Sequence, residues 1–201
     1  MDESAVLHPE GAQQRFKSQL AYAGGALMCT SASVHWLLAC LYKDKSDFFP
    51  EALLDTVMRW AAAQHEALTG RGLSSQRMLQ HEEVISGIGV PASFPHRVYC
   101  GHHLEDGPEE MAGFGDVVHM RVVEALLAPG TGCAVTANQH TVAAYRDRVG
   151  GLWLFDSLPG VERRVAAGGL AGALDEHLRK FEVCTLTRLE HHPGKRAKPC
   201  G

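Results

Sequence analysis

The sequence has no long apolar run, no excess of basic residues and no closely spaced pair of cysteines. The lack of about 18 consecutive apolar residues argues against a membrane-spanning helix. Lys and Arg number 19 against 23 Asp and Glu, and the net charge of −4 argues against a nucleic-acid partner. The chain does not begin with a basic segment followed by an apolar one, so no secretory signal is expected. We therefore expect a cytoplasmic protein, in its own cell or in a host cell, without a membrane partner.

The cysteines are spread over the whole chain. They are Cys29, Cys40, Cys100, Cys133, Cys184 and Cys200. Without a secretory signal, this spacing predicts free thiols rather than disulfides. Cys40, Cys133 and Cys184 stand in apolar runs, which predicts that they are buried.

Histidine is abundant, with 12 residues, and one cluster contains residue types that zinc binds. This cluster consists of Cys100, His102 and His103. Structural zinc sites draw their ligands from two spaced pairs. The nearest residues for a second pair are His81, His96 and His119. Because half a ligand set favours a polar loop with exposed imidazoles, we expect no metal and no other cofactor.

The length of 201 residues fits one domain, which we place at 1–190, followed by a flexible basic tail at 191–201. Apolar residues at three- and four-residue steps predict helices at 28–42, 49–68 and 74–85. Shorter apolar, β-branched or aromatic segments predict strands later in the chain. These strands are at 97–99, 132–137, 140–146, 151–156 and 181–189, with a helix at 168–180.

Two segments are ambiguous: 11–23 reads as a short helix or turn, and 117–127 as a short helix or strand. Helices dominate the first part of the chain and strands the second. This segregation predicts an α+β fold with helices packed on an antiparallel sheet. At the start of the helix at 28–42, the hydroxyls of Thr30, Ser31 and Ser33 are expected to cap free N–H groups.

Cys29, His140 and Asp156 form a pattern with a chemical reason. Cys29 follows a Gly-Gly break and opens the helix predicted at 28–42. A helix N-terminus and a neighbouring imidazolium both lower the pKa of a thiol, and the thiolate is the nucleophile. His140 begins one predicted strand and Asp156 ends the next, so a hairpin can bring the carboxylate beside the imidazole and orient it. We therefore predict a Cys-His-Asp triad.

A nucleophilic attack by Cys29 also needs hydrogen-bond donors for the oxyanion. The backbone N–H of Cys29 is one donor, and a side-chain amide can be the other. Gln19 is the first candidate among these amides, while Gln13, Gln14 and Asn138 remain alternatives.

Substrate contacts are predicted on both sides of this site. Gly24 and Gly25 would let a substrate backbone approach closely, because they carry no side chain. Asn138 and Gln139 directly precede His140 and are the other predicted contacts.

Two segments resemble the papain-like cysteine peptidases. GGALMCTSASVHWLLACL is similar to their nucleophile helix. HTVAAYRDRVGGLWLFDSLPG is similar to the strand–turn–strand block of compact deubiquitinating members, such as the Josephin-type enzymes and the herpesvirus tegument peptidases. The D-x-H arrangement of the tegument enzymes is absent here. The resemblance implies a papain-like fold, the roles of nucleophile, base, orienting acid and oxyanion donor for Cys29, His140, Asp156 and Gln19, and ubiquitin or a ubiquitin-like protein as substrate.

Three other interpretations remain open. A papain-like acyltransferase or amidase could use the same triad, because a fold does not fix the acceptor. A binding module could keep the fold with Cys29 as an unreactive helix residue. A zinc-stabilised interaction domain could be built on Cys100, His102 and His103.

Overall fold

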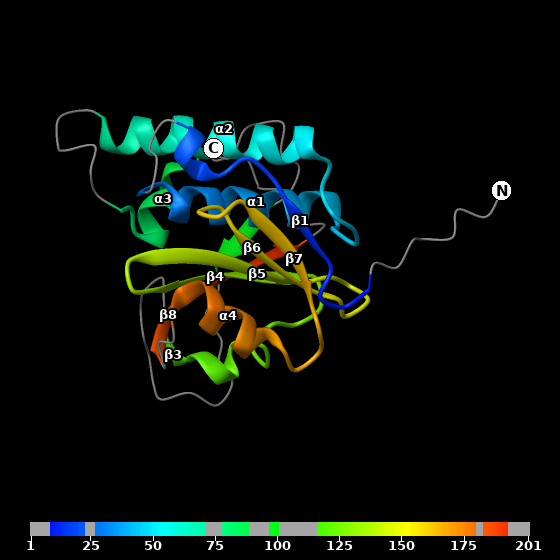
Figure 1. Ribbon diagram of the computed structural model, residues 1–201. Helices are drawn as coiled ribbons and strands as arrows, with labels where there is room; N and C mark the ends of the chain where they lie inside the picture. Colours follow the sequence, from blue (N-terminus) through cyan, green and yellow to red (C-terminus); the bar gives the residue numbers. More distant parts are fainter. Residues whose placement is uncertain are drawn as a thin grey trace.

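The computed structural model describes residues 9–22, 27–70, 78–88, 97–100, 116–179 and 183–192. These residues form a sheet with helices on both faces (Figure 1). In chain order the elements are β1 (Gln13–Arg15), η1 (Gln19–Ala21), α1 (Cys29–Lys43), α2 (Glu51–Thr69), α3 (His81–Gly87), β2 (Arg97–Cys100), β3 (Asp116–His119), η3 (Met120–Val122), β4 (Thr131–Ala137), β5 (His140–Arg146), β6 (Leu152–Asp156), β7 (Val161–Val165), α4 (Leu170–Leu178) and β8 (Val183–His192).

The described strands pair antiparallel in the order β1-β7-β6-β5-β4-β8-β2, and β3 also pairs with β8. The α+β class predicted from the sequence is therefore correct. Strand β8 continues to His192, two residues into the predicted tail, and residues 193–201 lie outside the described part of the chain. No helix among the described residues is long and apolar enough to cross a membrane.

Several predictions about elements were wrong or incomplete. The helix predicted at 74–85 begins only at His81, as α3, and residues 78–80 are not helical. The segment 11–23 contains the edge strand β1 as well as the turn η1, and β1 is held by its pairing with β7. Strand β7 was not predicted, because its sequence VERRV carries three charges in five residues. The segment 117–127 divides into β3 and η3. Strands β1, β3 and β7 are each held by pairing with another strand, and this pairing outweighs the local pattern.

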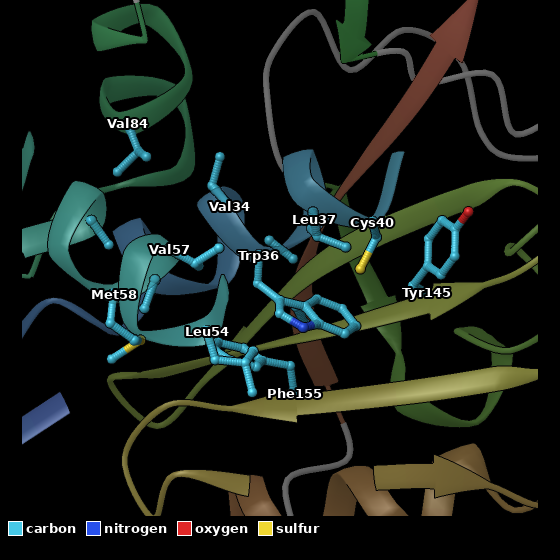
Figure 2. Close-up of a cluster of buried hydrophobic side chains, with 14 of the residues drawn as sticks. Val34, Trp36, Leu37, Cys40, Leu54, Val57, Met58, Val84, Tyr145 and Phe155 are labelled. Atoms are coloured by element: carbon cyan, nitrogen blue, oxygen red, sulfur yellow. The ribbon is translucent and has the colours of Figure 1, made fainter. Parts of the chain in front are cut away.

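Helix α1 lies at the centre of the molecule, between the sheet and the helices α2 and α3 (Figure 1). All residues of its first two turns from Cys29 to Val34 are buried. Trp36 and Leu37 are fully buried with side chains from α2 and the sheet, as Figure 2 shows. The helix predicted at 28–42 is therefore confirmed, and it is apolar on nearly every side because protein surrounds it.

The sheet is buried on both faces, and successive side chains of a strand point to opposite faces. On β5, Ala143 and Tyr145 belong to the apolar cluster with α1 and α2. Val142 and Ala144 belong to a second cluster, with α4 and η3. Burial on both sides explains why the predicted strands appear as continuous apolar runs. Gly132 of β4 permits the close approach of α1, because an added Cβ would collide with Leu37 and lie 3.1 Å from the carbonyl oxygen of Ala144.

A buried ion pair joins the end of α1 to β7. Lys45 Nζ lies 3.0 Å from Glu162 Oε1, and both side chains are fully buried. The other donors to this carboxylate are Trp36 Nε1 at 2.8 Å and the backbone N–H of Phe49 at 3.0 Å. The ammonium also lies 4.1 Å from the ring centres of both Phe49 and Trp153. The carboxylate depends on these donors, because water does not reach it.

Replacing Lys45 should therefore destabilise the fold strongly. We expect Lys45→Met to lower the free energy of unfolding by about 3–5 kcal/mol, because the variant leaves the Glu162 carboxylate buried without its cation. Urea denaturation measures this loss. Arg148→Met is the matched control: Arg148 pairs with Asp44 at 2.9 Å on the exposed surface, and it should cost at most about 1 kcal/mol. Equal losses in the two variants would contradict the expectation.

Candidate active site

Cys29 is the first residue of α1, and its side chain is fully buried. Its sulfur hydrogen-bonds with the side chain of His140 and with the backbone and hydroxyl of Thr141. Both partners lie at the start of β5. The sulfur of Met78 lies 3.6 Å from that of Cys29. The thiol singled out in the sequence is thus held between the N-terminus of α1 and the first residues of β5.

The hydroxyls at the start of α1 do not cap the helix, so this prediction was wrong. The N-cap residue is Met28, and no side chain caps it. Thr30 Oγ1 lies 3.0 Å from Thr141 Oγ1, and Ser33 Oγ donates to the carbonyl oxygen of Thr141 at 3.2 Å. Because the helix start is buried, the hydroxyls of Thr30 and Ser33 find their partners on β5 and attach α1 to the sheet.

His140 and Asp156 are in direct contact. His140 Nε2 lies 2.8 Å from Asp156 Oδ1. With Nε2 on the carboxylate, Nδ1 is the ring nitrogen left to face Cys29. Strands β5 and β6 are neighbours in the sheet, and their register makes His140 and Asp156 diagonal neighbours on one face. The hairpin predicted from the sequence does bring the imidazole and the carboxylate side by side.

Asp156 also binds a residue that the sequence analysis missed. His177 Nδ1 lies 2.7 Å from Asp156 Oδ2, and the backbone N–H of Leu158 donates to Oδ1 at 3.0 Å. His177 stands in the last turn of α4. Asp156 follows Leu152 and Leu154 at alternate positions of β6, and both leucines face α4. That alternation could have pointed Asp156 toward the α4 layer, but only the packing of α4 selects His177.

The hydrogen bonds of the site shift its pKa values in directions that favour charge. Burial disfavours the imidazolium of His140, yet the bonds to Asp156 and Cys29 outweigh burial and raise its pKa to about 9. Burial likewise disfavours the thiolate of Cys29, while His140 and Thr141 lower the thiol pKa below its usual range. For Asp156, the bonds from His140 and His177 overcome burial and lower its pKa. Both shifts at Cys29 and His140 favour a thiolate–imidazolium pair.

Gln19 lies in η1 and is fully buried. Its backbone N–H donates to the carbonyl oxygen of Ser157 at 2.8 Å, and its Oε1 accepts from Ser157 Oγ at 2.5 Å. The segment is also fixed by Ser18 Oγ, which donates to the Leu158 carbonyl oxygen. Gln19 is therefore anchored to the turn directly after Asp156. Its amide nitrogen Nε2 is buried without a hydrogen-bond partner among the described residues.

The alternative amides have other surroundings. Gln13 and Gln14 belong to β1, and Gln14 Nε2 donates to the Phe49 carbonyl oxygen at 3.0 Å. Asn138 and Gln139 form the exposed two-residue turn between β4 and β5, and both have a positive φ. They stand directly before His140 and are open to solvent.

Several predicted residues cannot be placed. Gly24 and Gly25 lie outside the described residues, as do His96, His102 and His103 and the side chain of Cys100. In the described ranges no three His, Cys, Asp or Glu side chains are grouped as metal ligands would be.

The described histidines and cysteines outside the site have other settings. His119 is exposed, and His81 is buried between two threonines. His35 bonds to Gln64 on α2 at 2.9 Å, away from the site. Cys40, Cys133 and Cys184 are buried free thiols, as predicted.

Comparison with solved structures finds a similarity of fold. No family model and no characterised protein matches the sequence. Among solved structures, the chain is similar to the ubiquitin-specific protease encoded by murine cytomegalovirus tegument protein M48, in complex with a ubiquitin-based suicide substrate. The TM-score is 0.62, the identity 12%, and the match covers 92% of this chain and 88% of that chain. At this identity the similarity concerns the fold, and the papain-like α+β fold predicted from the sequence is confirmed.

Removing the carboxylate should change the titration of His140. We expect Asp156→Asn to lower the pKa of His140 by about one pH unit or more, because the imidazolium loses its anionic partner. NMR titration of the imidazole resonances measures this value. His177→Asn is the control, since it leaves the contact between His140 and Asp156 in place and should preserve most of the raised pKa. An unchanged His140 titration in Asp156→Asn would contradict the expected coupling.

Proposed function

We propose that the protein is a cysteine hydrolase that cleaves ubiquitin or a ubiquitin-like modifier from its conjugates. The observation that carries this proposal is the hydrogen-bonded chain from Cys29 through His140 to Asp156. It places a thiol at a helix N-terminus, beside an imidazole whose other nitrogen is held by a carboxylate. This is the arrangement that a thiol needs to be activated as a nucleophile.

The reaction proceeds through a thioester. His140 Nδ1 takes the proton of Cys29, and the thiolate attacks the carbonyl carbon of the scissile amide. The tetrahedral intermediate then breaks its C–N bond, and His140 gives its proton to the leaving amine. A water molecule, deprotonated by His140, attacks the thioester in the second stage. The C–S bond breaks, the new carboxylate leaves, and Cys29 and His140 return to their first state. Asp156 keeps Nδ1 of His140 directed at the sulfur throughout.

Gln19 is the proposed oxyanion donor. Its Nε2, which has no partner within the described part of the chain, and the backbone N–H of Cys29 would bind the negative oxygen that develops during the attack. The bonds from Gln19 to Ser157 fix the amide before substrate arrives. This preorganisation matters because a donor that must be reoriented contributes less to the rate.

The choice of ubiquitin as substrate is supported by the fold. The similar structure is a ubiquitin-specific protease, with a ubiquitin-based suicide substrate bound to it. The match extends over nearly the whole of both chains. We infer that Asn138 and Gln139, exposed beside His140, contact the C-terminal segment of the modifier, together with Gly24 and Gly25.

A reactive ubiquitin tests nucleophile and substrate together. We expect ubiquitin with a thiol-reactive C-terminal group to form one adduct with the wild-type protein, seen by intact mass. Cys29→Ala should abolish the adduct, and His140→Ala should slow its formation at least 100-fold. His35→Ala is the matched control and should still react, because His35 binds Gln64 outside the site.

The other outcomes of this labelling are also informative. Rapid alkylation of Cys29 by iodoacetamide at pH 6 without a ubiquitin adduct would contradict the choice of substrate. The transfer of an added amine onto ubiquitin would indicate an acyltransferase. If neither the adduct nor the alkylation is observed, the hydrolase is rejected and a binding module is favoured.

The role of Gln19 can be separated from that of the thiol. We expect Gln19→Ala to lower kcat on a fluorogenic ubiquitin amide by about 100- to 1000-fold, as for the loss of an oxyanion donor. Alkylation of Cys29 by iodoacetamide forms no oxyanion and should keep its rate. Gln14→Ala and Asn138→Ala test the alternative donors and should keep most of kcat, while Asn138→Ala, at a proposed substrate contact, should raise KM. A large loss in either of them, with Gln19→Ala unaffected, would assign the donor elsewhere.

A further inference from the structure

A chain of polar side chains, all buried except the half-buried Thr136, leads away from Cys29. Thr141 Oγ1, which meets the sulfur of Cys29, lies 2.6 Å from Thr136 Oγ1. Thr136 Oγ1 lies 2.6 Å from His81 Nε2, and His81 Nδ1 lies 2.8 Å from Thr187 Oγ1. The chain thus crosses from β5 to β4, then to α3, and ends on β8.

Three of these side chains are shielded from water, and the fourth, Thr136, is half-buried. Thr141 and Thr187 are fully buried, and His81 is 6% exposed. Burial lowers the pKa of His81 to about 4, so its ring is neutral at physiological pH. A neutral imidazole has one N–H donor and one acceptor nitrogen. The ring forms hydrogen bonds with the hydroxyls of Thr136 on β4 and Thr187 on β8. His81 has no part in the reaction described above.

Counting protons gives the chain a single direction once Cys29 is a thiolate. A thiolate only accepts, so the one hydroxyl proton of Thr141 must point to the sulfur. Thr141 Oγ1 then has to accept from Thr136, and Thr136 Oγ1 has to accept from the N–H at His81 Nε2. His81 Nδ1 is left as the acceptor, and Thr187 donates to it. Thr30, 3.0 Å from Thr141, donates to the same oxygen.

We propose that Thr141 is a second donor to the Cys29 thiolate, and that Thr136 and His81 are positioning residues that fix the direction of its hydroxyl. The inference rests on the proposed role of Cys29 as nucleophile. It explains why the hydroxyl of Thr30 binds β5 instead of capping α1. It also gives buried His81 a function: its neutral ring, placed between Thr136 and Thr187, supplies the one N–H that aligns the hydroxyls of Thr136 and Thr141. The proton of the Cys29 thiol itself still passes to His140.

The pH dependence of Cys29 alkylation tests the inference without any ubiquitin substrate. The folded protein reacts with iodoacetamide at pH values from 4 to 10. The rate at each pH is measured from the labelling of the peptide that contains Cys29, after digestion. We expect Thr141→Val to shift the midpoint upward by about one pH unit, because the thiolate loses a charge-assisted hydrogen bond. Thr141→Ser keeps the hydroxyl and should restore the wild-type midpoint. Thr136→Val should shift the midpoint in the same direction by a smaller amount.

Thr131→Val is the matched control on β4. Its hydroxyl donates to the Ala128 carbonyl oxygen, outside the chain, so the midpoint should not move. Urea denaturation of each variant shows that it is folded. A low midpoint in the wild type that is the same in Thr141→Val would overturn the inference and leave the proposed function standing. A wild-type midpoint near the ordinary thiol value of about 8.5 would overturn both.

Discussion

The close approach of α1 to the sheet is the contact on which the rest of the molecule depends. The helix lies against β4 and β5 because Gly132 leaves room for Leu37, and its other sides are covered by α2 and α3. The ion pair of Lys45 and Glu162 then fixes the chain just beyond the end of the helix. With its axis set in this way, the first residue of α1 is brought to the start of β5. The position of Cys29 is thus a result of core packing along the whole helix.

Asp156 connects the two layers that cover the sheet. One carboxylate oxygen binds His140, which reaches the thiol at the start of α1, and the other binds His177 of α4. Three donors hold this carboxylate, so it has little freedom to rotate. The turn that follows Asp156 also anchors Gln19 from the other end of the chain. His140 and Gln19, which are far apart in sequence, are therefore both held by Asp156 and the turn that follows it.

The sequence predicted well those elements whose pattern is local. The periodicity of 28–42 identified the buried helix, and the apolar runs identified β4, β5, β6 and β8. The order of Cys29, His140 and Asp156 along these elements indicated which side chains could meet. By contrast, β1 and β7 are polar and exist because each pairs with a neighbour. The local sequence pattern of a strand does not show which other strand it pairs with.

What the sequence determined by itself is the class of fold and the types of residue available for chemistry. It placed a cysteine at a helix start, a histidine and an aspartate on adjoining strands, and a glutamine upstream. Only the tertiary structure decided that His177 binds the same carboxylate, of Asp156, as His140. It also decided that His81 is connected to the thiol through the hydroxyls of Thr136 and Thr141. The physical reason is that hydropathy patterns report which side of an element is buried. The choice of hydrogen-bond partners across layers is set by helix packing and strand register, which belong to the whole chain.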